Sequence, residues 1–205
     1  MSVTRTAYTV LGLGFFVIFM LEINDDSMYS YEVLGRPPDD AASLFIKGIS
    51  FIERGNSSEA INYFDRALDL NPIDVKVLNR KGVALMNLGN YTEAIKYFNK
   101  ALVIDPEYLF PYNNMGAALM NFGNYTGAIG YFDKAMKIDP DDEKSYSGKG
   151  TALLNLGNYT AAMEYFDKVL QEHFYDLDSL SGKGLVLSKL RNYTGAIYYF
   201  DKALA

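Results

Sequence analysis

Residues 89–106 read GNYTEAIKYFNKALVIDP, and related strings recur along the chain every 34 residues. Three residue types mark the recurrence in all five copies. They are Gly48, Gly82, Gly116, Gly150 and Gly184; Ala60, Ala94, Ala128, Ala162 and Ala196; and Phe64, Phe98, Phe132, Phe166 and Phe200. Repetition at one fixed spacing indicates an array of identical supersecondary units, each about the size of two short helices.

The pattern inside one unit predicts two helices joined by a tight turn. Residues 75–88 carry an apolar stripe that includes Gly82, a residue small enough for a neighbouring backbone to come close. Residues 91–104 carry Ala94 and Phe98 on one face, and Pro106 follows the second helix. Because one such pair cannot bury its apolar face alone, we expect the pairs to stack and share a continuous core.

The sequence therefore predicts an all-α fold: an α-solenoid of about five helix-turn-helix units, preceded by an N-terminal apolar helix. Three segments are expected, namely a signal peptide or membrane anchor over 1–22, a linker over 23–40 and the repeat array over 41–205. The predicted units span 41–74, 75–108, 109–142, 143–176 and 177–205. Below, a repeat position is counted from the first residue of its unit.

These strings resemble the tetratricopeptide repeat (TPR), whose pattern W-x2-L-G-x2-Y…A-x3-F…P also has a period of 34 residues. The resemblance covers residues 41–205 and departs from the pattern in three places. In the fourth unit His173 and Phe174 replace the Asp-Pro that ends the second helices of the second and third units, so an irregular junction is expected there. The other two departures are at positions 4 and 7. Position 4 is never tryptophan. Position 7, where leucine is usual, is occupied by Lys47, Lys81, Met115, Lys149 and Lys183. We expect these lysines to lay their aliphatic stems over the core and to keep their amines in water.

The N-terminal segment has the charge pattern of an export signal. Residues 7–21 form an uncharged run that follows Arg5 and precedes several acidic residues. As a helix the run would span about 22 Å, which is shorter than the ~30 Å core of a bilayer. Small residues suited to a cleavage site are missing next to it, so an uncleaved membrane anchor is favoured slightly over a cleaved signal. A buried core helix is the third reading. The chain is thus expected to be an exported or membrane-anchored TPR protein of prokaryotic type, with its repeats outside the cytoplasm.

Composition excludes several classes of function. The chain has no cysteine and one histidine, which rules out disulfides, thiol nucleophiles and two-histidine metal sites. Its net charge of -6 argues against binding to nucleic acid. His173 is expected in a loop between units, without the partners of a catalytic triad. We therefore expect no enzyme activity, no cofactor and no metal.

The resemblance implies a concave groove, lined by the first helix of each unit, that binds a peptide or a partner's helix. Side-chain amides in this groove could hydrogen-bond the backbone of an extended peptide without selecting its side chains. The alternative is that they are ordinary solvated residues. The groove residues so implied are Lys76, Asn79, Arg80, Asn87, Phe110, Asn113, Asn114, Asn121, Lys144 and Asn155.

Five N-x-S/T sequons fall in register at position 16, and their asparagines are Asn56, Asn90, Asn124, Asn158 and Asn192. Asparagine is a good helix N-cap, and duplication of a unit would copy a sequon without any need for it. Threonine at position 18, where the TPR pattern favours an acid, weakens that explanation. We expect N-glycosylation at some of these sites, along one edge of the array.

Two further functions compete with a scaffold. TPR arrays resemble the substrate-binding arms of O-linked glycosyltransferases, although the sequence has no phosphate loop or nucleotide motif. The last unit also lacks a polar capping helix, so Ile197, Phe200 and Leu204 are expected to face nothing and to favour self-association through that end. A longer array, of which this chain is a piece, would explain the same feature.

Overall fold

A computed structural model describes residues 40–204 of the chain. This part contains ten α-helices and no strand. They are α1 (Ala41–Glu53), α2 (Ser57–Leu70), α3 (Val75–Asn87), α4 (Tyr91–Ile104), α5 (Leu109–Asn121), α6 (Tyr125–Ile138), α7 (Glu143–Asn155), α8 (Tyr159–Glu172), α9 (Leu177–Lys189) and α10 (Tyr193–Leu204). The predicted solenoid of about five helix pairs is confirmed, and α3 and α4 match the predicted helices 75–88 and 91–104 to within one residue.

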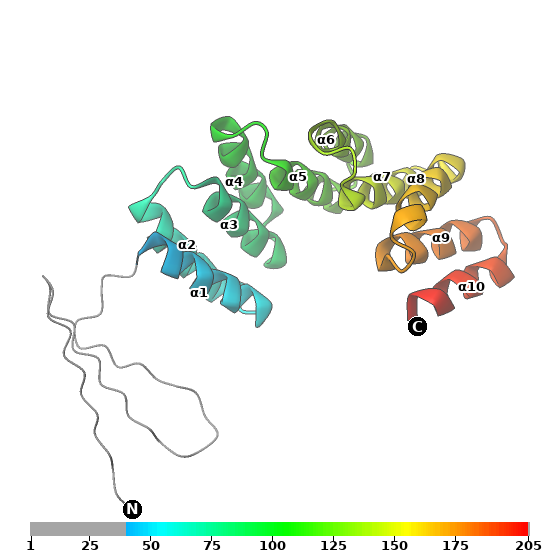
Figure 1. Cartoon of the computed structure of the whole chain (residues 1–205), viewed down its shortest axis with the longest axis horizontal. Coiled ribbons are helices and arrows are strands. Elements are labelled where there is room, and N and C mark those ends of the chain that lie inside the picture. The colour runs from blue at the N-terminus through cyan, green and yellow to red at the C-terminus, as the bar shows by residue number, and fades with distance from the viewer. Residues whose placement is uncertain (1–39, 205) are drawn as a thin grey trace, which may run out of the picture.

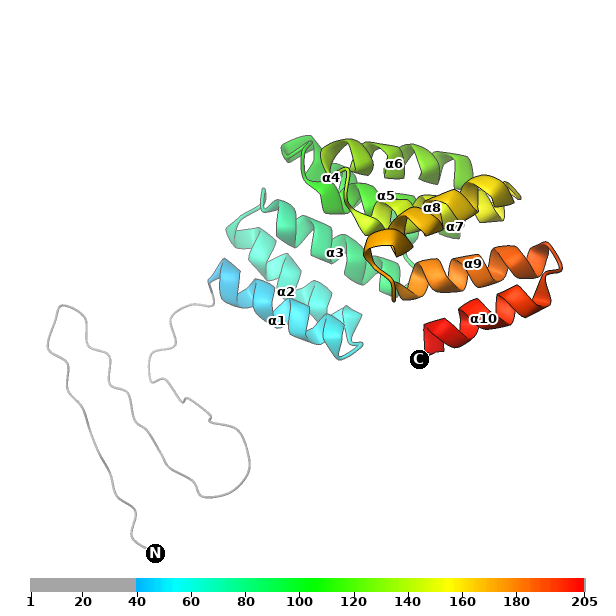
Figure 2. The same ribbon diagram turned by 45° about the vertical axis from the view of Figure 1, so that its right-hand side comes forward.

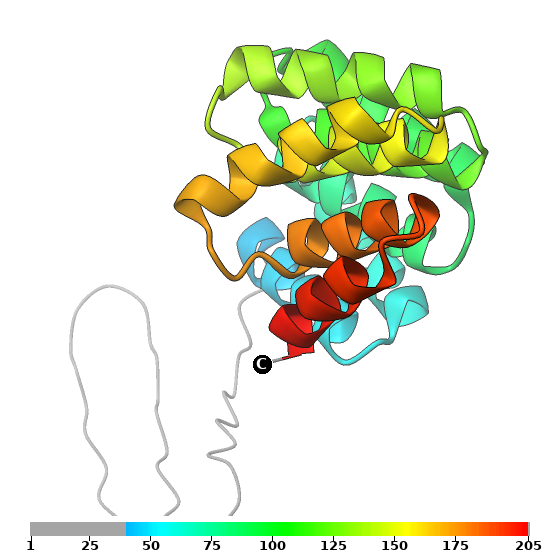
Figure 3. The ribbon, with the colours of Figure 1, turned by 90° about the vertical axis from the view of Figure 1, so that its right-hand side faces the viewer.

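The helices pack as successive hairpins, each of which contacts the next (Figure 1). The array curves into an arch, with α3 and α5 on its inner side and α4 and α6 on its outer side. Figure 2 shows α9 and α10 side by side as the last hairpin, and Figure 3 views the array from that side. Consecutive first helices contact one another, whereas consecutive second helices within residues 40–204 do not. The first helices therefore line the inner face, as the TPR resemblance implies.

Capping side chains fix where the helices begin. Aspartates cap four of the first helices, as Asp74 does by accepting hydrogen bonds from the backbone N–H of Lys76 and Val77. Only α5 begins without such a cap among these five, because its N-cap residue is Tyr108. Asparagine caps every second helix.

The core of each unit depends on a glycine at position 8 and a phenylalanine at position 24. A β-carbon on Gly82 would lie 2.4 Å from the ring of Phe98, and the other four units repeat this contact at 2.4–2.7 Å. The close neighbour is thus an aromatic ring of the same unit, and the expected close approach of a backbone was wrong. Phe98 itself is fully buried.

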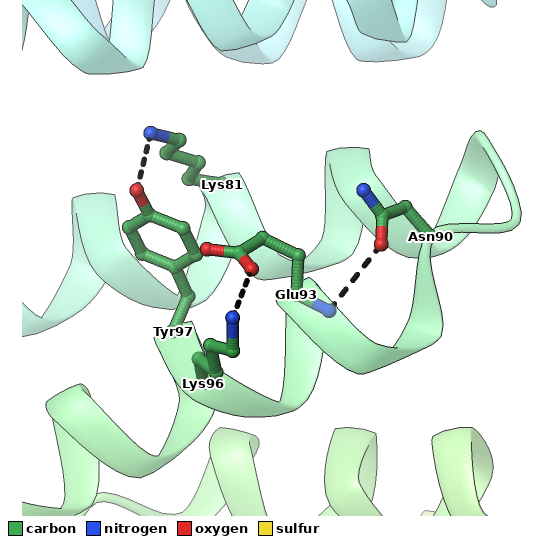
Figure 4. A network of polar contacts seen from close by, with 5 residues as sticks. All are labelled: Lys81, Asn90, Glu93, Lys96 and Tyr97. Atoms are coloured by element: carbon green, nitrogen blue, oxygen red, sulfur yellow. Dashed lines mark hydrogen bonds and ion pairs between the residues drawn. The ribbon is translucent and has the colours of Figure 1, made fainter.

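The lysines at position 7 join consecutive units. Lys81 of α3 donates to Asp65 of the preceding unit. It also donates to the hydroxyl of Tyr97 in its own unit, 2.6 Å away (Figure 4). Lys149 pairs with Asp133 at 2.6 Å, and Lys183 pairs with Asp167. The prediction that these amines lie in water is therefore wrong, because an aspartate of the preceding helix binds each of the three. We call this arrangement the lysine bridge.

The junction between the second and third units has no lysine bridge. Met115 stands at the lysine position and Asn99 at the aspartate position, so both charges are replaced together. Met115 packs there in an apolar cluster with Phe98 and Leu85. An unpaired buried charge at this junction would be costly, and the joint replacement avoids it.

Several predictions fall on residues 1–39 and lie outside the described residues: the apolar helix, the signal or anchor, and the linker. Within residues 40–204, no helix is both long and apolar enough to cross a membrane. His173 follows α8 directly, as its C-cap, and its Nε2 lies 3.2 Å from the carboxylate of Glu143. The backbone there resembles the corresponding caps of α2, α4 and α6.

Candidate interaction surface

The inner face has an apolar centre. Positions 9 and 12 of the first helices carry half-buried apolar side chains in the first three units. They are Ile49, Ile52, Val83, Met86 and Met120. Each packs against the core below it and keeps part of its surface exposed. A partner could bury this exposed apolar surface without any change in the fold.

Two different edges border this centre. Near the start of the helices, exposed Lys76, Arg80 and Lys144 lie at positions 2 and 6. At the end of the helices, exposed Asn87, Asn121 and Asn155 repeat at position 13. Since a helix rises about 1.5 Å per residue, roughly 10–17 Å separate the basic edge from the amide edge. From the start to the end of the first helices, the inner face thus carries basic, then apolar, then amide side chains.

Three predicted amides form hydrogen bonds between units. Asn114 of α5 donates to Oδ1 of Asn79 of α3 at 2.8 Å, and Asn79 is only 3% exposed. Asn113 donates to Asp142 at 2.7 Å and accepts from Ser145 at 2.8 Å. These groups hold neighbouring inner helices together. Their further role in binding stays a prediction.

The amides at position 13 have free carbonyl oxygens at the surface. Asn121 and Asn155 donate to the backbone carbonyls of Ala117 and Thr151, four residues earlier. Asn87 donates to the hydroxyl of Ser57 at 3.3 Å. Within residues 40–204 no hydrogen bond occupies their Oδ1 atoms, so this edge presents hydrogen-bond acceptors in the second, third and fourth units.

Phe110 lies beside the basic edge, 51% exposed, in edge contact with Tyr108. The sequence patterns did not single out Val83 and Met86, which belong to the apolar centre. Their signal was present, because each occupies the same repeat position as another apolar residue of the groove, Ile49 and Ile52 respectively. What hid them was their ordinary appearance as core residues.

A separate pocket lies between the third and fourth units. It has a volume of about 610 Å³ and is lined by residues of α6, α7 and α8, among them Asp133, Tyr146 and Lys168. Lys149 in its wall belongs to a lysine bridge. Within the part of the chain that the structure describes, no group of His, Asp and Glu is arranged to hold a metal ion.

Comparison with known families gives the family of this fold. Models described as tetratricopeptide repeat match residues 32–72, 45–108 and 148–205 and residues 119–176. These segments cover well over half of the chain. The chain belongs to the tetratricopeptide repeat family. No match was found among curated proteins.

Solved TPR structures share the fold at low sequence identity. MamA from Desulfovibrio magneticus RS-1 is 22% identical with a TM-score of 0.67, over 82% of this chain and 94% of MamA. PilF of Pseudomonas aeruginosa is 22% identical with a TM-score of 0.71, over 80% and 75% of the two chains. YrrB, described as a TPR protein with an unusual peptide-binding site, is 22% identical with a TM-score of 0.58, over 81% and 86%.

Proposed function

We propose that this TPR chain is an interaction scaffold whose inner face binds a segment of a partner protein. One observation carries the proposal. The inner helices of the first three units carry half-buried apolar side chains, which are bordered by basic side chains in the second and fourth units and by amide acceptors in the second to fourth units. A segment with one apolar side and one acidic side matches the centre and the basic edge together. YrrB, which shares the fold, is described as having a peptide-binding site.

Charge reversal at the basic edge tests this proposal. A photo-crosslinker at Met120 would first identify the partner in the native cells, with a crosslinker at Val103 on the outer side as the control. The affinity of the purified partner is then measured for Arg80→Glu and for Lys137→Glu, which reverses an exposed charge on α6. We expect Arg80→Glu to weaken binding at least about tenfold and Lys137→Glu to leave it unchanged. Equal affinities for the two variants would refute the site.

We further propose that the array is displayed outside the cytoplasm and is held to the membrane by residues 1–22. The uncharged run 7–21, with Arg5 before it and acids after it, supports this orientation. Protease treatment of intact and lysed cells tests it. Digestion of the array in intact cells is the expected result, and protection until lysis would contradict the display.

Self-association through the last unit is a second candidate. Asp201 of α10 stands at position 25, where Asp65, Asp133 and Asp167 each bind a lysine of the following unit. Ile197 and Leu204 beside it are 59% and 86% exposed. The prediction that Phe200 has no neighbour is wrong, because Gly184 lies against its ring. Light scattering on the wild type and on Ile197→Lys tests the idea, and a wild-type monomer would refute it.

A further inference from the structure

The five sequon asparagines have a structural explanation of their own. The side-chain Oδ1 of each accepts a hydrogen bond from the backbone N–H three residues later, at distances of 2.9–3.3 Å. Figure 4 shows this cap for Asn90 and Glu93. Such a cap contributes about 1 kcal/mol to a helix. Asparagine at position 16 would therefore be retained whether or not it is modified.

The threonines two residues later have no such explanation. Thr92, Thr126, Thr160 and Thr194 lie on the first turns of α4, α6, α8 and α10, and all four are exposed. Within residues 40–204 their hydroxyls form no hydrogen bond with the rest of the chain. Threonine forms helix less readily than glutamate, and an acid here would gain roughly 0.3–1 kcal/mol from the helix dipole. The fold thus gains nothing from the residue that completes each sequon.

The same edge carries a row of exposed apolar side chains. Leu88, Phe122, Leu156 and Leu190 occupy position 14, two residues before a sequon asparagine, and are 49–55% exposed. They end the first helices and follow one another at the unit spacing. Phe122 is in edge contact with Tyr91 of the preceding unit, with ring centroids 5.8 Å apart. The apolar surface that these four side chains expose is therefore available to a covering group.

We propose that Asn90, Asn124, Asn158 and Asn192 carry N-linked glycans that cover this row. The inference rests on the proposed display outside the cytoplasm, where glycan transfer takes place. The capping geometry permits the modification, because the bond forms at Nδ2 while the cap uses Oδ1. The first sugar, attached two residues from Leu88 or Phe122, then lies over the exposed apolar side chain with its C–H faces.

The transfer requires a glycan donor linked to a polyprenyl phosphate or pyrophosphate and a membrane transferase. The Nδ2 atom attacks the anomeric carbon, the bond from that carbon to the phosphate oxygen breaks, and a carbon–nitrogen bond forms. Nδ2 loses one proton, and the lipid phosphate departs with the electron pair of the broken bond. One N–H and the carbonyl oxygen remain on the asparagine, so the N-cap persists in the product.

The fold indicates that the glycans are added before the array has folded. In the finished structure the threonine lies on a helical turn that packs into the array, which keeps asparagine and threonine from extending together into a transferase. Glycans are therefore added during translocation, before the second helix of each unit docks. All four asparagines are exposed, which leaves room for the glycans.

Mass spectrometry of the full-length protein from its native cells tests this inference. We expect sugar on peptides that contain the four sequons. Thr126→Glu should abolish the modification at Asn124, and Thr126→Ser, which keeps the sequon, should retain it. Neither variant disturbs the cap, since the backbone N–H that Asn124 binds belongs to Gly127.

Cell fractionation separates the two proposals. Unmodified peptides from protein that lies outside the cytoplasm would overturn the glycan inference and leave the display intact. Unmodified protein found only in the cytoplasm would overturn both. Sugar that persists in Thr126→Glu would show that the sequon does not direct the modification, which also overturns the inference.

Discussion

The ring of Phe98 on α4 occupies the space in which a side chain on Gly82 of α3 would stand, with a separation of 2.4 Å. The ring is fully buried between the two helices of the unit and cannot move aside without opening the core. The glycine is therefore required by the size of its partner. The same relationship explains why glycine and phenylalanine recur together in all five units.

Gly82→Ala should destabilise the array by about 2 kcal/mol, since one added methyl group overpacks a filled core. Gly130→Ala is the matched control, because Gly130 is exposed on α6 and a β-carbon there would meet no neighbouring atom within 4 Å. That change should stabilise the helix by roughly 1 kcal/mol. Urea unfolding of both variants measures the difference. If the two substitutions changed the free energy of unfolding equally, packing against the ring of Phe98 would not be the reason for glycine at position 82.

The lysine bridge should show coupling in a double-mutant cycle. Lys81→Met and Asp65→Asn together reproduce the composition of the junction formed by Met115 and Asn99. We expect the double variant to be more stable than the sum of the single effects predicts, by about 1 kcal/mol.

The control is the pair formed by Lys96 and Glu93 on the surface of α4, where the lysine side chain is 62% exposed. Coupling there should be much weaker than at Lys81 and Asp65, because water screens the charges. Additive effects at Lys81 and Asp65 would show that the bridge does not bind the units together.

Alkaline pH should weaken the junctions. Burial alone would lower the pKa of Lys81, but its hydrogen bonds to Asp65 and Tyr97 outweigh this effect, so that the pKa is raised above 10.5. The pKa values of Lys149 and Lys183 are raised through Asp133 and Asp167 in the same way. A raised lysine pKa gives stability that is present below the unfolded value and is lost as pH rises through the folded value.

Thermal unfolding between about pH 9 and 12 therefore should show a falling melting temperature, steeper than in a variant with Lys81→Met, Lys149→Met and Lys183→Met. The difference between the two curves reports the bridges. Parallel curves would contradict the prediction.

Arg191 should be a weak point of the last unit. It has φ of 62°, whereas glycine occupies the same position in the other four units with φ of 71–78°. A left-handed conformation costs a residue with a β-carbon about 1–2 kcal/mol, and glycine avoids most of this cost. Arg191→Gly should therefore raise stability by about 0.5–1 kcal/mol in denaturant unfolding. Gly157→Arg, the reverse change in the turn before α8, should lower it.

The repeat period was enough to predict the helix pairs, because glycine and proline mark the helix ends and the apolar spacing marks the buried faces. The partners of polar side chains were harder to predict. The bond between Asn79 and Asn114 joins residues 35 positions apart, and the bridge from Lys81 spans 16 positions. In each pair the two residues lie on different helices, so the periodicity within one helix does not predict that they are in contact. Recognition of Asn99 and Met115 as a joint replacement likewise needed the contact between units.

The junction that lacks a lysine bridge also sets the order in which the array should come apart. Three of the four junctions depend on a protonated amine, whereas the one formed by Met115 and Asn99 depends on apolar contact and on neutral amides. High salt or alkali thus loosens the outer junctions first and leaves the second and third units attached to each other. We therefore expect the second and third units to be the last part of the array to unfold when salt or pH is raised.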